Sequence, residues 1–152
     1  MTKLNQLFGD IADLRIKSFD LNGHKFKVRI PLTKEMEDMA KRIDDIPEEE
    51  IEQRFQKMTT GFKESDKIEG VEFTDNDVVV NGRSTREVAK QAIQVERRVE
   101  EYFRLLIPAD GQVNDLTYQE IDEVFPFTVQ LELISAISDA IQPGYKEQRK
   151  NS

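Results

Sequence analysis

An Asn-Gly pair near the N-terminus constrains the fold more strongly than any other feature of the chain. Asn22-Gly23 lies between two segments in which apolar and polar residues alternate. Because both positions of such a pair tolerate a positive φ, this pattern is typical of a two-residue β-hairpin turn. The sequence therefore predicts a hairpin over residues 14–30, whose second strand has one buried face and one basic, exposed face. The apolar residues are Ile16, Phe19, Leu21, Phe26, Val28 and Ile30, and the basic residues are Lys25, Lys27 and Arg29.

The rest of the chain is dominated by apolar residues that recur three and four positions apart, as in amphipathic helices. This spacing predicts helices over residues 33–62, where Thr33 is expected to cap the first one. It also predicts helices over residues 85–142. Two capping boxes, residues 84–87 and residues 117–120, mark helix starts in this second region.

A second, shorter hairpin is predicted over residues 71–80, because residues 74–77 (Thr-Asp-Asn-Asp) are turn formers between valine-containing segments. The expected fold class is therefore α+β: a mostly helical domain with one or two small antiparallel β-hairpins. We assign a single domain to residues 14–144. An N-terminal arm over residues 1–13 precedes it, and a flexible tail over residues 145–152 follows it.

The N-terminal arm carries Leu4, Leu7 and Phe8 at helical spacing. Two interpretations are open. The arm is either a short amphipathic helix that extends from the domain, or a frayed terminus that packs on its own domain. We favour the second interpretation at this point.

The charge balance excludes several classes of protein. The 152 residues include 22 Lys and Arg against 30 Asp and Glu, a formal net charge of −8, and 34% of all residues are charged. A nucleic-acid-binding protein needs a basic face to neutralise phosphates, so we predict no nucleic-acid partner. No segment has the roughly 18 consecutive apolar residues of a membrane span, and the N-terminal residues lack a signal-peptide pattern. With no cysteine either, the chain is expected to be soluble and intracellular, with no membrane partner.

The sequence offers little for catalysis or for cofactor binding. His24 is the only histidine and cysteine is absent, so His- or Cys-based metal sites and catalytic pairs are not expected. Residues 75–77 (Asp-Asn-Asp) are similar to the start of a calcium loop, but they fit a tight turn better because the later ligand positions do not follow. The acidic residues of 38–52 fit solvated helix faces better than a two-metal cleft. We therefore predict no catalytic, cofactor-binding or metal-binding residues.

An apolar segment near the C-terminus is the strongest candidate for a binding surface. Phe125-Pro126-Phe127 and Leu131 are explained either by plain core packing or by a groove for an amphipathic segment of another protein. Residues 96–101, a run of mixed charge, fit an exposed helix face, with a partner-docking stripe as the alternative. The candidate partner-binding residues are Phe125, Phe127, Leu131, Ile134 and Tyr145.

The order of these elements is similar to that of a known family. Residues 19–33 (FDLNGHKFKVRIPLT) lead into residues 34–37 (KEME), and acidic helices, a Phe-Pro-Phe helix and a short charged tail follow. Over most of the chain this layout resembles the tail assembly chaperones of bacteriophages with long, non-contractile tails. The passage from hairpin to helix is the best-matching part.

The resemblance implies a non-catalytic protein that acts in the cytoplasm of the bacterial host. Such chaperones bind the long helical tape-measure protein, keep it soluble and recruit tail-tube subunits around it, so the implied partners are the tape-measure protein and the tail-tube protein. Self-association is a further expectation. Three other interpretations stay open: a structural head–tail connector or minor tail protein, a small metal-dependent enzyme that uses the acidic cluster, and a regulatory adaptor.

Overall fold

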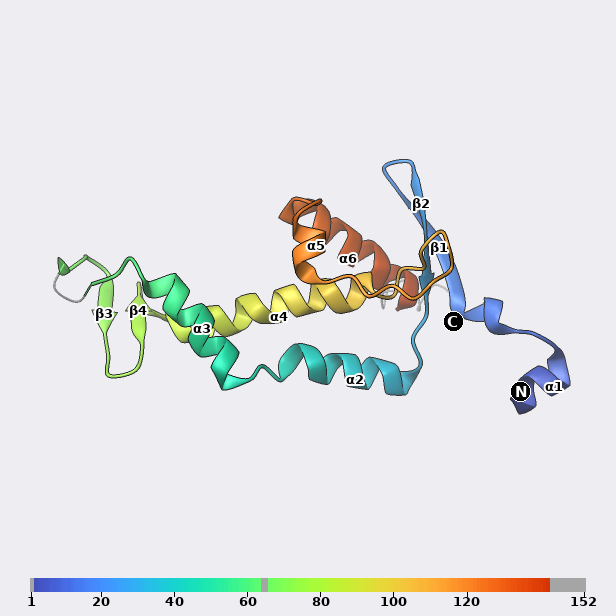
Figure 1. Ribbon diagram of the computed structural model, residues 1–152, viewed down its shortest axis with the longest axis horizontal. Helices are drawn as coiled ribbons and strands as arrows, with labels where there is room; N and C mark the ends of the chain where they lie inside the picture. The colour runs from blue at the N-terminus through green and yellow to red at the C-terminus, as the bar shows by residue number, and fades with distance from the viewer. Residues whose placement is uncertain (1, 64–65, 143–152) are drawn as a thin grey trace, which may run out of the picture. The chain divides into compact units, whose positions relative to one another are not determined.

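The computed structural model describes residues 2–63 and 66–142 of the chain (Figure 1). It is an α+β fold with one two-stranded and one three-stranded antiparallel sheet, which confirms the expected fold class. The tail predicted over residues 145–152 lies outside the described residues.

The chain divides into two compact units. Unit 1 is formed by Met1–Met39 together with Val99–Ser152, and unit 2 is formed by Ala40–Arg98. Both boundaries fall within helices, so the single domain expected over residues 14–144 stays a prediction.

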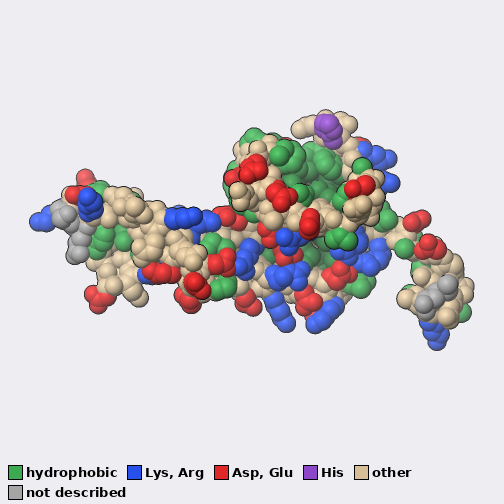
Figure 2. Space-filling view, in the orientation of Figure 1, with side chains coloured by type: hydrophobic (Ala, Val, Ile, Leu, Met, Phe, Trp, Pro, Cys, Tyr) green, Lys and Arg blue, Asp and Glu red, His purple; other side chains and the backbone are tan. Residues whose placement is uncertain are grey.

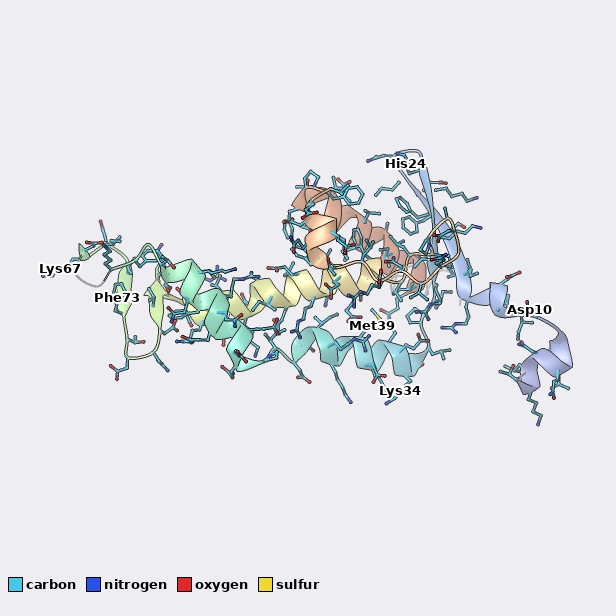
Figure 3. The ribbon with its side chains drawn as sticks, in the orientation of Figure 1. Asp10, His24, Lys34, Met39, Lys67 and Phe73 are labelled. Carbon is cyan, nitrogen blue, oxygen red and sulfur yellow. The ribbon has the colours of Figure 1, made fainter. Side chains whose placement is uncertain are left out.

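The predicted N-terminal hairpin is confirmed in unit 1. Strands β1 (Ile16–Leu21) and β2 (His24–Arg29) pair antiparallel, and Asn22 and Gly23 form the turn between them with φ of 52° and 85°. A positive φ at both central positions gives the turn the twist that its flanking strands need, as the Asn-Gly pair predicts. His24 is exposed at the tip of this hairpin (Figure 3).

The apolar residues of the first strand do not all lie on one face of the hairpin. Phe19 and Phe26 are cross-strand partners whose stacked rings have centroids 5.4 Å apart, and Val28 is 0% exposed. Side chains alternate between the two faces along a strand, so Ile16 lies opposite Arg29 on the other face. Ile16 is 40% exposed on that face.

In addition to its pairing with β1, strand β2 pairs with a segment that is far away in the sequence. Val28 forms an isolated antiparallel bridge with Leu106. The N–H of Arg29 donates to the carbonyl of Leu105 at 2.9 Å, and the N–H of Ile107 donates to the carbonyl of Lys27 at 2.8 Å. These two backbone bonds flank Val28 and bring the chain that follows α4 (Thr85–Phe103) back to the hairpin.

Helices α5 (Tyr118–Asp122) and α6 (Phe127–Ile141) complete unit 1, and α6 packs on both strands of the hairpin. Thr117 caps α5 as its capping box predicts, because its Oγ1 accepts the N–H of Glu120 at 3.3 Å. The buried residues of α6 recur at helical spacing, and they are Gln130, Leu133, Ile134, Ile137 and Ile141.

Glu35, in the first turn of α2 (Thr33–Asp44), connects three parts of unit 1. Its Oε1 accepts hydrogen bonds from Arg15 at 2.8 Å and from the N–H of Leu32 at 3.0 Å, and its Oε2 accepts one from Arg29 at 2.7 Å. The hydrogen bond from Arg29, followed by the one from Leu32, lowers the pKa of the Glu35 carboxyl from 4.5 to about 2.

Unit 2 contains α3 (Glu48–Thr59) and a three-stranded sheet. The hairpin predicted over residues 71–80 is confirmed as β3 (Val71–Phe73) and β4 (Val78–Val80). β5 (Arg83–Ser84) adds a third strand, which the sequence analysis did not predict. The buried hydrophobic cluster of this unit is formed by Ile46, Ile51, Ala89 and Ile93.

Asp77 organises the junction between this sheet and the start of α4. Its Oδ1 accepts the N–H groups of Val78 at 2.8 Å and Arg86 at 3.2 Å, and its Oδ2 accepts the hydroxyl of Ser84. Burial alone raises the pKa of the Asp77 carboxyl, but the hydrogen bonds from Ser84, Val78 and Arg86 outweigh it and hold the pKa below its ordinary value.

Ion pairs bind α3 to α4 within unit 2. Arg54 forms a bidentate pair with Glu96 at 2.6 and 2.8 Å. Arg97 pairs with Glu50 and also donates to two carbonyls at the end of α2. The expectation of an exposed face over residues 96–101 is therefore wrong for Glu96 and Arg97, because both are used for packing between helices.

One predicted helix cap is confirmed and another is wrong. The Oγ of Ser84 accepts the N–H of Glu87 at 3.2 Å, as the capping box at the start of α4 predicts. Thr33, in contrast, is the first helical residue of α2. The residue before it, Leu32, has the capping position, where its N–H is bound by Glu35.

We predict that Glu35→Gln weakens unit 1 in a pH-dependent way. A carboxyl whose folded pKa is depressed stabilises the fold above its unfolded pKa and loses this effect as the pH falls through its folded value. The variant should therefore be less stable than the wild type by about 1–2 kcal/mol at pH 7, which allows for solvent screening of a side chain about one-third exposed. Urea unfolding at several pH values should show this difference shrinking from pH 4.5 to pH 2. Glu37→Gln, an exposed neighbour on α2, is the control.

We also predict that Asp77→Ala destabilises unit 2 by roughly 2–3 kcal/mol, because it removes the acceptor of three donors at once. Asp75→Ala removes an exposed carboxylate from the same turn and should change stability by less than about 0.5 kcal/mol. Thermal and urea unfolding compare the two variants. Equal effects would contradict the organising role of Asp77.

Candidate protein-binding surface

Unit 1 exposes a row of apolar side chains at the start of α6. Val124 is 70% exposed, Phe127 50% and Leu131 45%. Phe127 and Leu131 are four residues apart and so share one helix face, and Val124 lies in the turn just before it. We call these three residues the apolar ridge. Figure 2 shows hydrophobic side chains gathered on the surface over α5 and α6.

The five predicted partner-binding residues are not all in the same environment. Phe127 and Leu131 are on the surface as members of the ridge. Phe125 is half-buried, with its ring 6.3 Å from that of Phe103, and Ile134 is only 9% exposed. Tyr145 lies outside the described residues.

Val124 is the ridge residue that sequence reasoning missed. It lies in the turn between α5 and α6, and Pro126 interrupts the helical pattern between Val124 and Phe127. Helical spacing therefore gives no signal for the position of Val124.

The turn that carries the ridge is held from inside by a buried glutamine. Gln130 is 0% exposed, and its Nε2 donates to the carbonyl of Phe125 at 2.9 Å and to Oδ1 of Asp122 at 3.0 Å. These two bonds tie the end of α5 and the Phe125-Pro126 turn to the first turns of α6. The ridge is therefore presented by fixed backbone rather than by a free loop.

The segment that carries the ridge contains acidic residues and no basic ones. Residues 105–142 contain no Lys or Arg, and their acidic residues are Asp110, Asp115, Glu120, Asp122, Glu123, Glu132 and Asp139. Glu132 and Asp139 are exposed and, being seven residues apart, lie on one face of α6. Figure 2 shows acidic side chains among the hydrophobic ones over α5 and α6.

A second exposed apolar surface lies on the N-terminal arm. Helix α1 (Lys3–Phe8) has no buried residue. Leu4 is 56% exposed, Leu7 63% and Phe8 70%. The interpretation that this arm packs on its own domain, which the sequence analysis favoured, is therefore wrong, and the alternative of an extended amphipathic helix describes the structure.

Unit 1 also contains a solvent-accessible pocket of about 920 Å³ between β2 and the chain that follows α4. Lys25, Phe26 and Lys27 line one side, and residues 106–116 line the other. Basic side chains of the strand thus face Asp110 and Asp115 of the loop. This mixture of charge sets no preference for one kind of ligand.

Two of the acidic residues of α3 are used in ion pairs. Glu50 pairs with Arg97, and Glu52 pairs with Arg86, whose guanidinium also lies 4.0 Å from the centre of the Phe55 ring. Hydrogen bonds from Arg86 and then Gln56 hold the pKa of the Glu52 carboxyl below its ordinary value.

Within residues 2–63 and 66–142, no three His, Asp or Glu side chains come together in a group that could hold a metal ion. No helix in the same part of the chain is both long enough and apolar enough to cross a membrane. Comparison of the chain with protein-family models, with curated proteins and with solved structures finds no match.

We predict that the exposed and buried faces of α6 differ sharply in their contribution to stability. Ile137→Ala, at a site that is 0% exposed, should lower the free energy of unfolding by about 2–5 kcal/mol, because it leaves a cavity. Phe127→Ala, at a site that is 50% exposed, should cost less than about 1 kcal/mol. Urea unfolding measures both. A large loss for Phe127→Ala would place this residue in the core instead of the ridge.

Proposed function

We propose that this chain is a non-catalytic tail assembly chaperone of a bacteriophage with a long, non-contractile tail. It binds and solubilises the tape-measure protein in the cytoplasm of the bacterial host, and it helps to recruit tail-tube subunits. The observation that carries this proposal is the pair Phe127 and Leu131, both about half exposed on one face of α6. The choice of this family is supported by the order of elements over residues 19–37, which resembles that of these chaperones.

The physical argument concerns the solubility of the partner. A long helical protein that exposes apolar stripes aggregates unless another surface covers them. A cover needs an apolar face that can lie along a helix, and the ridge offers one. It also needs a strongly ionic outer surface, which a net charge of −8 and 34% charged residues provide.

A structural head–tail connector or minor tail protein remains the second candidate. The same ridge would serve a permanent contact in a finished particle equally well, because exposure alone does not set the lifetime of a complex. The two functions differ in one observable property: a connector is present in purified virions, and a chaperone is absent from them.

The test is co-expression with the products of the neighbouring genes, above all any very long helical protein among them. The wild-type chain should keep that protein soluble and co-purify with it. Phe127→Asp combined with Leu131→Asp should weaken binding by at least about 30-fold, roughly 2 kcal/mol, because two charges would be placed in an apolar contact. Soluble yield and co-purification measure the effect.

The matched control is Ile68→Asp combined with Val113→Asp. These residues are also exposed, at 42% and 92%, but neither belongs to the ridge. Circular dichroism checks that both double variants are folded. If the wild-type chain neither binds nor solubilises the long protein, the chaperone proposal is wrong. If both double variants bind equally well, the ridge is not the binding surface.

A further inference from the structure

Helix α1 has an apolar face that is exposed to solvent. Leu4, Leu7 and Phe8 are three and four residues apart, so they share one face of the helix. A helix of six residues is marginal by itself in water, since isolated helices need roughly 12–15 residues. The structure nevertheless shows α1 formed, with Thr2 as its cap. Docking of its apolar face would supply the stability that its length does not.

The apolar ridge fits this helix in length. Leu4 and Phe8 lie four positions apart on α1, and Phe127 and Leu131 lie four positions apart on α6, so each pair spans about 6 Å at the helical rise per residue. Three apolar side chains on each surface would then meet three on the other.

The two surfaces are also complementary in charge. Lys3 is the only charged residue from Thr2 to Gly9, and it is exposed. The ridge lies in a segment with acidic residues and no basic ones, and Glu132 and Asp139 are exposed beside it on α6. A weakly basic apolar helix is therefore matched to an acidic apolar surface.

The way the arm is anchored determines which copy supplies it. Only residues 9–11 separate α1 from the short 3-10 helix Ala12–Arg15, which is fixed to unit 1 by Arg15 through Glu35 and Ile30. Three extended residues reach about 10 Å and α1 itself adds about 9 Å, whereas α6 is about 22 Å long. In unit 1 the helix α6 starts beside α5 and runs towards β1 (Figure 1), so the ridge lies at its far end from the hairpin.

We propose that the ridge of one copy of this chain is occupied by α1 of a second copy. Each copy offers one arm and one ridge, so two copies satisfy both surfaces by exchanging arms. This proposal concerns the chain by itself and does not rest on the chaperone function. It adds a consequence to that function, because a helical partner that binds the ridge must displace the arm.

The experiment is a complementation test with two full-length variants. The arm variant, Leu4→Asp with Phe8→Asp, keeps an intact ridge. The ridge variant, Phe127→Asp with Leu131→Asp, keeps an intact arm. Sedimentation velocity and light scattering should show that the wild type dimerises and that each variant alone has a dissociation constant raised at least about tenfold. An equal mixture should form a one-to-one complex, since each variant supplies the surface that the other lacks.

Several results would overturn the proposal. They are a wild type that stays monomeric at its highest soluble concentration, an arm variant that associates as the wild type does, and a mixture that forms no mixed complex. A monomer whose arm is protected from proteolysis would mean docking within one copy. If the ridge variant fails to fold by circular dichroism, Phe127→Ser replaces it. None of these measurements contains a tape-measure protein, so this proposal and the chaperone function fail separately.

Discussion

Unit 1 depends on the backbone pairing between β2 and the segment that follows α4. Val28 is 0% exposed because hydrogen bonds on both sides of it, at Lys27 and Arg29, fix the strand against Leu105 and Ile107. The two segments are distant in sequence, so the entropy of closing that large loop must be offset by what the closure brings together. It brings the hairpin under α6, whose buried residues then have an apolar surface to cover. This pairing therefore joins the hairpin to the part of the chain that leads into α5 and α6.

The exposed ridge follows from the limited width of the core between the hairpin and α6. The hairpin has only two strands, and α6 packs on it while burying residues that include Ile137 and Ile141. Phe127 and Leu131 do not belong to this buried set and are about half exposed. The free-energy cost of exposing these two side chains to water therefore results from how the hairpin and α6 pack together. A surface of this kind is stabilised by whatever covers it, whether a partner helix or another copy.

Local sequence chemistry predicted the elements but not their long-range contacts. Asn-Gly at residues 22–23 gave the first hairpin because the turn's φ values are decided within four residues. The same pair at residues 81–82 turns the chain from β4 into β5, the strand that the sequence analysis did not predict. Three contacts join residues that are tens of positions apart: the bridge between Val28 and Leu106, and the ion pairs Arg54–Glu96 and Arg97–Glu50. The periodicity of a sequence carries no information about such long-range contacts. The candidate site shows the same limit: spacing gives the face of a helix but not its depth, so Phe127 and Ile134 looked equivalent although only one is exposed.

The acidic residues in the segment around the ridge determine which kinds of surface the ridge binds favourably. An apolar face alone would accept any hydrophobic segment, including identical ridges of other copies. With acidic residues and no basic ones across residues 105–142, two ridges repel each other, and association through like surfaces is disfavoured. A weakly basic helix is favoured instead, and α1 with Lys3 is one that every copy carries. The same charge pattern thus keeps the exposed surface from aggregating with itself while leaving it open to a helix of complementary charge. An arm that is only six residues long would hold the ridge weakly enough to be exchanged for a longer helix.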